Sequence, residues 1–268
     1  MKHLVKSFGN ECCFSPTDKF EKTVSVSYDS VEHDPDAEVK VFVHNEHSAV
    51  NPYTIPNVLD NYESFDLILS WSDELKHLPN FETFIFGDCW IDFDTFKPQK
   101  GNQVSFITSN KSFTPGHKMR LDIWSGLDGV EELNGMELLK HMSPPRVPNK
   151  NFIFEKAKYS IVVENVQCNN MITEKLIDCL ATKTIPIYWG APNVGDYFDT
   201  KGIISFNTLY ELKDILDNLQ ESFYDNNLDV IEKNYEESKK YWDYHDSRRL
   251  KIENFIEDQI NSEKFGRV

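Results

Sequence analysis

The sequence predicts an α/β protein with two domains, each built on a parallel β-sheet. First, short apolar runs separated by helical spacers fill the N-terminal third, a pattern typical of parallel sheets covered on both faces. Second, a polar break over residues 97–101, with Pro98 and Gly101, separates these runs from a second set. Third, the second set contains a strand–helix–strand unit of about 30 residues, the size of a βαβ crossover. We therefore place the domains at residues 1–98 and 99–268.

The elements follow from these runs in chain order. In the first domain, the predicted strands are Val39–Val43, Asp66–Ser70 and Thr83–Gly87. A short helix over Asp73–Leu78 is stopped by Pro79. In the second domain, the predicted strands are Val104–Thr108, Tyr159–Val163, Thr184–Tyr188 and Ile203–Phe206. The predicted helices are His117–Leu127, Thr173–Ala181, Leu209–Leu219 and a charged helical stretch from Leu228 to near Ile260.

Composition and charge exclude several classes of protein. The 268 residues include 28 basic and 44 acidic side chains, a net charge of −16, which disfavours general nucleic-acid binding. Hydrophobic residues make up 40%, enough for a core, yet no apolar run approaches the roughly 18 residues of a membrane span. The segment Met1–Lys6 lacks the apolar run of a signal peptide, so we expect a cytoplasmic protein. The five cysteines are odd in number, and we interpret adjacent Cys12 and Cys13 as ordinary reduced cysteines.

The charge is distributed unevenly along the chain. Residues 51–95 carry nine acidic side chains and one basic side chain, whereas residues 96–120 carry no acidic side chain. The acid-free stretch contains His117 and the cations Lys97, Lys100, Lys111, Lys118 and Arg120. A solvated loop and a local anion pocket are both consistent with such a run.

The stretch most informative for chemistry is residues 158–198. An apolar strand ends in Glu164 and Asn165, and Thr173 can then cap the next helix. Loops at the carboxyl ends of parallel strands bind ligands in open α/β sheets, and helix N-termini favour phosphate. Lys175 in the first turn is unfavourable with respect to the helix dipole and is better explained by a bound anion. The alternative is a Thr-capped helix with two solvated charges, Glu174 and Lys175.

The same stretch resembles a known family. Its sequence Tyr-Ser-Ile-x-x-Glu-Asn begins at Tyr159, and Ile-Thr-Glu-Lys-Leu begins at Ile172. Ile-Pro-Ile-Tyr-Trp-Gly-Ala-Pro-Asn begins at Ile185, and Asp-Tyr-Phe follows at Asp196. Together these motifs resemble the donor-binding signature of the α1,3/4-fucosyltransferases, which are family 10 glycosyltransferases. The resemblance implies the GT-B fold, in which two Rossmann-like domains flank a cleft. Residues 1–98 would bind the acceptor and residues 99–268 the nucleotide sugar, and the last helix is a candidate to pack back on the N-terminal domain.

The resemblance also implies roles for individual residues. The residues implied to hold the donor are Glu164, Asn165, Thr173, Glu174, Lys175 and, on the diphosphate, Arg120. Arg120 lies in the acid-free stretch, so local charge and family pattern point to the same residue. One position departs from the family, because Met171 stands where members commonly have Tyr before Ile-Thr-Glu-Lys.

The N-terminal domain supplies the candidate general base. The family places a glutamate after a strand, and Glu46 follows the strand Val39–Val43 in the matching place. A base is needed because a sugar hydroxyl is a weak nucleophile until its proton is removed. Asp73, Glu74 and His44 are alternative bases.

The implied reaction is an inverting transfer of fucose from GDP-fucose to a glycan hydroxyl. The implied partners are therefore the nucleotide sugar and a glycan acceptor, with no obligatory cofactor and no metal site.

Asp92-Phe93-Asp94 has the spacing of a metal motif, but we interpret it as a charged surface turn. The tryptophans Trp71, Trp90 and Trp189 could stack on sugars, although core positions are more common. Two rival functions are a transferase for another nucleotide sugar, motivated by Met171, and an inactive sugar-binding relative.

Overall fold

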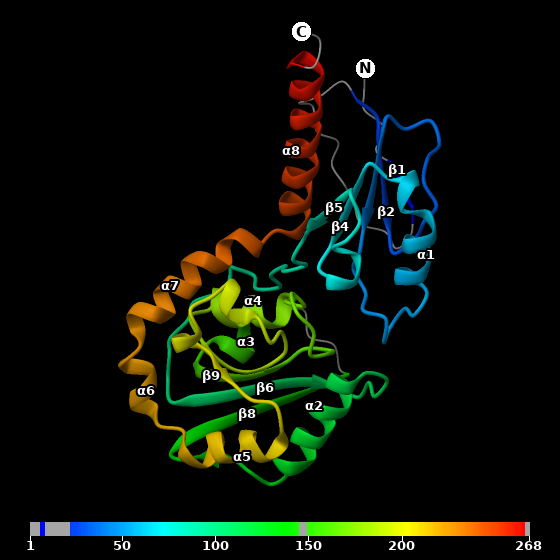
Figure 1. The fold of residues 1–268 in the computed structure, drawn as a ribbon. Coiled ribbons are helices and arrows are strands. Elements are labelled where there is room, and N and C mark those ends of the chain that lie inside the picture. The colour runs from blue at the N-terminus through cyan, green and yellow to red at the C-terminus, as the bar shows by residue number, and fades with distance from the viewer. Residues whose placement is uncertain (1–5, 9–21, 145–148, 266–268) are drawn as a thin grey trace. The chain divides into compact units, whose positions relative to one another are not determined.

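The computed structural model describes residues 6–8, 22–144 and 149–265, so Cys12 and Cys13 lie outside the described residues. The chain divides into two compact units, Met1–Ile85 with Asp243–Val268 and Phe86–Trp242 (Figure 1). The boundary between the units falls before the polar break at residues 97–101, because the intervening chain bonds to the second unit. The Gly87 N–H donates to the Ile172 carbonyl (3.0 Å), and the Trp90 N–H donates to Asp178 Oδ1 (2.6 Å).

The first unit contains a parallel sheet in the order β1-β2-β3-β4-β5. Its strands are β1 (Lys6–Phe8), β2 (Val24–Tyr28), β3 (Val39–Val43), β4 (Leu67–Ser70) and β5 (Phe81–Thr83). Its helical segments are α1 (Thr54–Asn61), η1 (Tyr62–Ser64), η2 (Asp73–Leu75) and the C-terminal α8 (Tyr244–Phe265). Ile55 and Val58 of α1 pack in one apolar cluster with Phe42 and Ile68 of the sheet.

One predicted strand of this unit is wrong over most of its length. Thr83–Gly87 is an apolar run, but strand pairing ends at Thr83. The neighbouring β4 ends at Ser70, whose carbonyl accepts the last bond, from the Phe84 N–H (3.0 Å). The chain continues without regular structure through Gly87 and Asp88, which both have positive φ. Phe84 and Ile85 are buried although the strand ends at Thr83, which explains why the run is apolar but not a strand.

The second unit contains a six-stranded sheet in the order β11-β10-β9-β6-β8-β7. Its strands are β6 (Gln103–Ser109), β7 (Glu132–Leu133), β8 (Met136–Ser143), β9 (Ala157–Val163), β10 (Ile185–Trp189) and β11 (Ile204–Ser205). Its α-helices are α2 (Pro115–Gly126), α3 (Asn151–Phe154), α4 (Glu174–Ala181), α5 (Leu209–Asn218), α6 (Glu221–Asp225) and α7 (Leu228–Ser238). Its short 3₁₀ segments are η3 (Val194–Asp196), η4 (Thr200–Gly202) and η5 (Lys239–Tyr241). All pairings are parallel except that of β7 with β8.

Helices cover both faces of this second sheet. In Figure 1, α2 and α5 lie on one side of β6 and β8, and α3 and α4 lie on the other. Every residue of β9 is buried, as the near-continuous apolar run predicted for a covered parallel strand. Because β9 lies between β10 and β6, its carboxyl end is where the helices that follow β6 and β9 both begin.

Candidate active site

A buried carboxylate ends the central strand of the second unit. Glu164 follows β9 directly and is fully buried. Its Oε1 accepts the Thr173 N–H (3.0 Å), and its Oε2 accepts the Thr173 hydroxyl (2.7 Å). The carboxylate therefore ties the residue that precedes α4 to the end of β9, which fixes where α4 begins.

The first turn of α4 places a cation beside two carboxylates. Thr173 is the N-cap, and its hydroxyl oxygen accepts the Lys175 N–H (3.4 Å). Lys175 Nζ lies 2.9 Å from Thr173 Oγ1, 3.1 Å from Glu174 Oε1 and 3.5 Å from Glu164 Oε2. The sequence-predicted residues Glu164, Thr173, Glu174 and Lys175 are thus in mutual contact.

A second helix begins at the same strand end. Thr114 caps α2 through a reciprocal capping box with His117. The Gly116 N–H donates to the Asn165 carbonyl (2.8 Å), so the N-terminus of α2 lies against the end of β9. Arg120, one turn further along, donates from Nη1 to the Val163 carbonyl (2.5 Å) and from Nη2 to Asn165 Oδ1 (3.0 Å). The structure therefore brings Arg120 and Asn165 to the residues that surround Glu164.

Electrostatics keeps the buried groups charged. Burial alone would raise the pKa of Glu174, but Lys175 and Lys150 outweigh it and lower that pKa to about 2. Burial acts in the opposite direction on Lys175, yet Glu174 and Glu164 raise the pKa of its ammonium group. Burial lowers the pKa of the nearby His117 to about 4, helped by the positive charges of Arg120, Lys111 and Lys175. His117 is therefore neutral near pH 7 and leaves the positive charge to the other side chains.

This arrangement suits a bound anion. The N-termini of α2 and α4 both present the positive ends of helix dipoles. Lys175 lies in the first turn of α4, and Arg120, in the second turn of α2, reaches back to the end of β9, so both add formal positive charge there. Phosphate groups bind at such N-termini, and fixed cations strengthen that binding in a partly buried site.

Some basic side chains of the acid-free stretch lie at the site, and others do not. Arg120 and His117 lie on α2 beside the end of β9, which agrees with an anion pocket. Lys100 does not contribute to it, because its Nζ donates to the Phe154 and Ala157 carbonyls and to Thr184 Oγ1 (2.9, 2.7 and 2.6 Å). The clustering of cations in the sequence thus overstates the positive charge at the site.

The candidate base lies in the first unit. Glu46 is exposed on the turn that follows β3. The alternative base His44 is buried, and its two ring nitrogens lie 2.8 Å from Ser70 Oγ and 3.0 Å from the Glu46 carbonyl oxygen. Burial lowers the pKa of His44 to about 4, so His44 is a neutral structural side chain. Asp73 pairs with Lys76 at 2.6 Å, and Glu74 interacts with His47.

Sequence analysis missed three residues of the second unit that shape the site. A Cβ on Gly116 would lie 1.7 Å from the Glu164 carbonyl oxygen, so only glycine allows α2 to approach β9 so closely. A Cβ on Gly190 would lie 2.7 Å from Glu164 Cγ and 2.2 Å from the Tyr188 hydroxyl oxygen. Lys150 Nζ lies 2.6 Å from Asp178 Oδ2 and 3.9 Å from Glu174 Oε1. Of these three residues, only Gly116 had a signal in the sequence, because it directly follows a Thr-Pro pair that can begin a helix.

The other sequence-predicted features fall outside this site. Trp71 and Trp189 are buried, as expected for core residues, whereas Trp90 is 51% exposed. Asp92-Phe93-Asp94 enters a turn in which Asp92 Oδ1 accepts the Asp94 N–H (3.1 Å). In the part of the chain that the structure describes, no group of three or more His, Cys, Asp or Glu side chains could hold a metal ion. Within residues 6–8, 22–144 and 149–265, no helix is both long and apolar enough to cross a bilayer.

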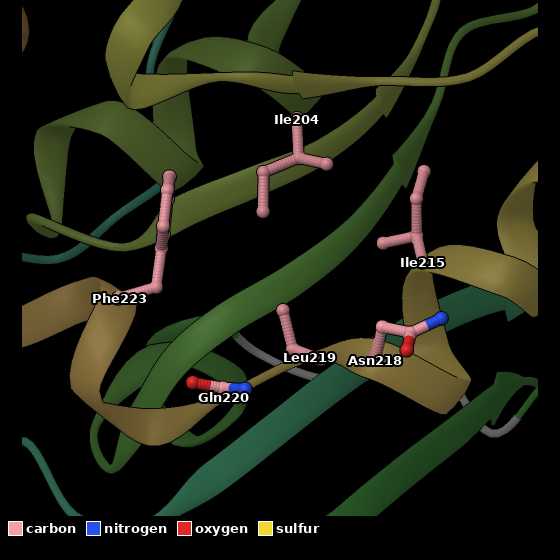
Figure 2. Close-up of a pocket in the computed structure, with 6 residues that line it drawn as sticks. All are labelled: Ile204, Ile215, Asn218, Leu219, Gln220 and Phe223. Atoms are coloured by element: carbon pink, nitrogen blue, oxygen red, sulfur yellow. The ribbon is translucent and has the colours of Figure 1, made fainter.

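A separate surface pocket of about 220 Å³ lies beside β11, α5 and α6 (Figure 2). Its lining residues are Ile204, Ile215, Asn218, Leu219, Gln220 and Phe223. No ionisable side chain is among them, so the pocket has no charge with which to hold a phosphate.

Comparisons with known proteins show what the chain is similar to. Residues 97–265, more than half of the chain, match the C-terminal region of glycosyltransferase family 10 (fucosyltransferase). The alpha-(1,3)-fucosyltransferase FucT of Helicobacter pylori is 28% identical over 176 residues, which cover 65% of this chain and 34% of FucT. The chain thus spans about a third of the length of that relative.

Two crystal structures of alpha1,3-fucosyltransferase share the fold. The structure with GDP has a TM-score of 0.53 at 20% identity and covers 81% of this chain and 71% of its own. The structure with GDP-fucose has a TM-score of 0.52 at 20% identity and covers 81% and 70%. The fold is of the mixed α/β, GT-B type, as the sequence predicted. Taken with the motif residues gathered at the end of β9, the match over residues 97–265 establishes that the chain belongs to glycosyltransferase family 10.

Proposed function

We propose that the protein is an inverting fucosyltransferase that transfers fucose from GDP-fucose to a hydroxyl of a glycan. The observation that carries this proposal is the meeting of two helix N-termini, Lys175 and Arg120 at the carboxyl end of β9. A nucleoside diphosphate has the charge that such a site would hold. The solved structure of alpha1,3-fucosyltransferase with GDP-fucose supports the choice of donor.

In this proposal the second unit holds the donor. Lys175 and Arg120 bind the diphosphate, and Glu174 accepts hydrogen bonds from hydroxyl groups of the donor. Glu164 and Thr173 fix the first turn of α4, and Asn165 orients the guanidinium of Arg120. The first unit takes the acceptor, as predicted for residues 1–98.

The reaction is a single displacement at the anomeric carbon. The acceptor oxygen forms the new bond while the bond from the anomeric carbon to the diphosphate oxygen breaks, which leaves GDP. Glu46 takes the proton of the acceptor hydroxyl. Lys175, Arg120 and the helix N-termini stabilise the negative charge that develops on GDP, and such preorganised charge usually contributes more to catalysis than any other effect. Because two side-chain cations supply this charge, we expect turnover without an added metal ion and unchanged turnover in a chelator.

The test is a panel of nucleotide sugars assayed by thermal shift and by release of nucleoside diphosphate. A ligand at 100 times its Kd stabilises the native state by about 2.7 kcal/mol, so binding will be visible as a higher Tm. We expect GDP-fucose to give the largest shift and Lys175→Met to abolish it. Lys213→Met is the matched control, because Lys213 forms an exposed pair with Asp217 on α5. Parental GDP-fucose binding by Lys175→Met would refute the proposed site.

A transferase for a different nucleotide sugar is the second candidate. Met171 stands where the family commonly has a Tyr, and here it is 3% exposed in the loop before α4. The site therefore lacks one hydroxyl next to the proposed donor. Turnover of another nucleotide sugar in the panel, without turnover of GDP-fucose, would favour this candidate. Binding without turnover of any donor would favour an inactive sugar-binding relative.

A further inference from the structure

We propose that Asp29 is a positioning residue that holds the Glu46 turn in its productive conformation. The inference rests on the proposed role of Glu46 as general base. It goes beyond that role, because neither the sequence motifs nor the family match over residues 97–265 involves Asp29.

Asp29 follows β2 and contacts the turn that follows β3. β2 and β3 are parallel neighbours, with Tyr28 paired to Val43, so the residues that follow each strand emerge side by side. The Asp29 N–H donates to the Val43 carbonyl (3.1 Å). Its Oδ1 accepts the Asn45 N–H (2.9 Å), and its Oδ2 accepts the Glu46 N–H (3.0 Å). One carboxylate therefore fixes two consecutive amides of the turn.

The side chain of His44 also contacts this turn, at the carbonyl group of Glu46. The neutral ring places Nε2 3.0 Å from the Glu46 carbonyl oxygen, so this nitrogen carries the hydrogen and donates it. Nδ1 then accepts the Ser70 hydroxyl (2.8 Å). The ring also stacks on Trp71, with centroids 4.6 Å apart. Both the N–H and the carbonyl of exposed Glu46 are thus held by side chains of the first unit.

Asp29 has an unfavourable backbone conformation and a partly buried charge, which indicates that the geometry of the turn matters for function. Asp29 has φ of +49°, a left-handed conformation uncommon for residues other than glycine. Burial raises the pKa of Asp29 to about 6, although the N–H bonds from Asn45 and Glu46 lower it. The negative charge of Glu46 contributes to this rise, so ionised Asp29 also opposes a like charge on its neighbour. Strained and partly buried groups of this kind cluster at functional sites.

An aspartate is the side chain that this geometry requires. Two carboxylate oxygens accept the two N–H groups, whereas an asparagine offers one oxygen and turns its NH₂ donor toward the other amide. Asp29→Asn keeps the size of the side chain but should lose one of the two hydrogen bonds to the backbone N–H groups of the turn. Misplacement of a catalytic group by about 1 Å can cost about 100-fold in rate. We therefore expect kcat to fall between about 10-fold and 100-fold, with the KM for GDP-fucose unchanged.

The experiment is a double-mutant cycle of Asp29→Asn and Glu46→Gln, with hydrogen exchange of the Asn45 and Glu46 amides. Asp66→Asn is the matched control, because Asp66 accepts the Lys40 N–H (2.7 Å) at the opposite end of β3. If Asp29 acts through Glu46, Asp29→Asn lowers kcat in the parent, speeds exchange at the turn, and causes no further loss in Glu46→Gln. Asp66→Asn should keep the parental kcat. Asp29→Ser, which leaves a shorter acceptor, provides the same comparison if Asp29→Asn does not fold.

Three results would overturn the proposal in distinguishable ways. If Asp29→Asn lowers kcat by the same factor in the parent protein and in Glu46→Gln, the role of Asp29 is merely structural. Parental kcat in Asp29→Asn, with Glu46→Gln inactive, would refute the positioning role and leave Glu46 as base. Parental kcat in Glu46→Gln would refute the base assignment, and the inference with it.

Discussion

Thr173 is the side chain whose replacement tests the site most directly without any ligand. Its hydroxyl donates to the buried Glu164 carboxylate (2.7 Å), and its oxygen accepts the Lys175 N–H (3.4 Å) as the N-cap of α4. Thr173→Val keeps the shape and the β-branch but removes both interactions, together with the contact between Lys175 Nζ and Thr173 Oγ1 (2.9 Å). A lost N-cap costs about 1 kcal/mol, and a lost hydrogen bond to a buried charged group costs about 1.5–3 kcal/mol. We therefore expect the free energy of unfolding of the second unit to fall by about 3 kcal/mol.

Thr208→Val is the control that separates the two contributions. Thr208 caps α5 by accepting the Glu211 N–H (3.2 Å), and it is exposed. Its replacement should cost only the cap, about 1 kcal/mol. The measurement is urea denaturation at unchanged m-value, together with hydrogen exchange of the β9 amides as a report on the second unit. Equal losses for Thr173→Val and Thr208→Val would refute the role assigned to the Thr173–Glu164 bond.

The remaining predictions concern charge. Arg120→Met should weaken binding of GDP more than binding of guanosine, and equal losses by calorimetry would mean that Arg120 does not contact phosphate. The pKa of Glu174, lowered from its ordinary value of 4.5 to about 2, contributes stability that is present above pH 4.5 and lost as pH falls toward 2. Lys175→Met should move that loss to higher pH, and a denaturation series from pH 2 to 6 with unchanged pH dependence would contradict the pairing. Asp73→Asn should keep parental turnover, because Asp73 pairs with Lys76, and a collapse would move the base there.

Much of the second unit could be predicted because its sequence is locally consistent. Continuous apolar runs predict buried parallel strands, and the run at β9 gives a strand with every residue buried. Thr173 before an apolar helical face predicts both the start of α4 and its cap. The match between capping residue, helix face and strand explains why Glu164, Thr173, Glu174 and Lys175 lie in contact at one strand end.

The β7–β8 hairpin was missed, although the sequence contained its signal. Asn134 and Gly135 have φ of +51° and +81° and join the antiparallel strands β7 and β8. Asn-Gly is the strongest short-range hairpin signal, because both turn residues need positive φ. β7 has only two residues, and the polar side chains Glu137, Lys140 and His141 interrupt the apolar pattern of the eight-residue β8, so apolar periodicity alone predicted no strand there.

Close approach between elements could not be predicted from local pattern. Gly116 is needed because the Glu164 carbonyl oxygen occupies the space of a Cβ, and the two residues are far apart in sequence. The same holds for Lys150, whose contacts with Glu174 and Asp178 depend on how the chain before α3 passes α4. Such pairings depend on tertiary packing and leave no periodicity in the sequence.

The structure also changes why an anion is expected beside Lys175. A cation in the first turn of a helix opposes the dipole by about 0.3–1 kcal/mol, which by itself suggests a bound phosphate. The contacts with Glu174 and Glu164 at 3.1 and 3.5 Å already offset a cost of that size. The dipole of α4 alone therefore does not require an anion. What favours one is that α2 begins at the same strand end, where Arg120 and the dipole of a second helix add positive charge.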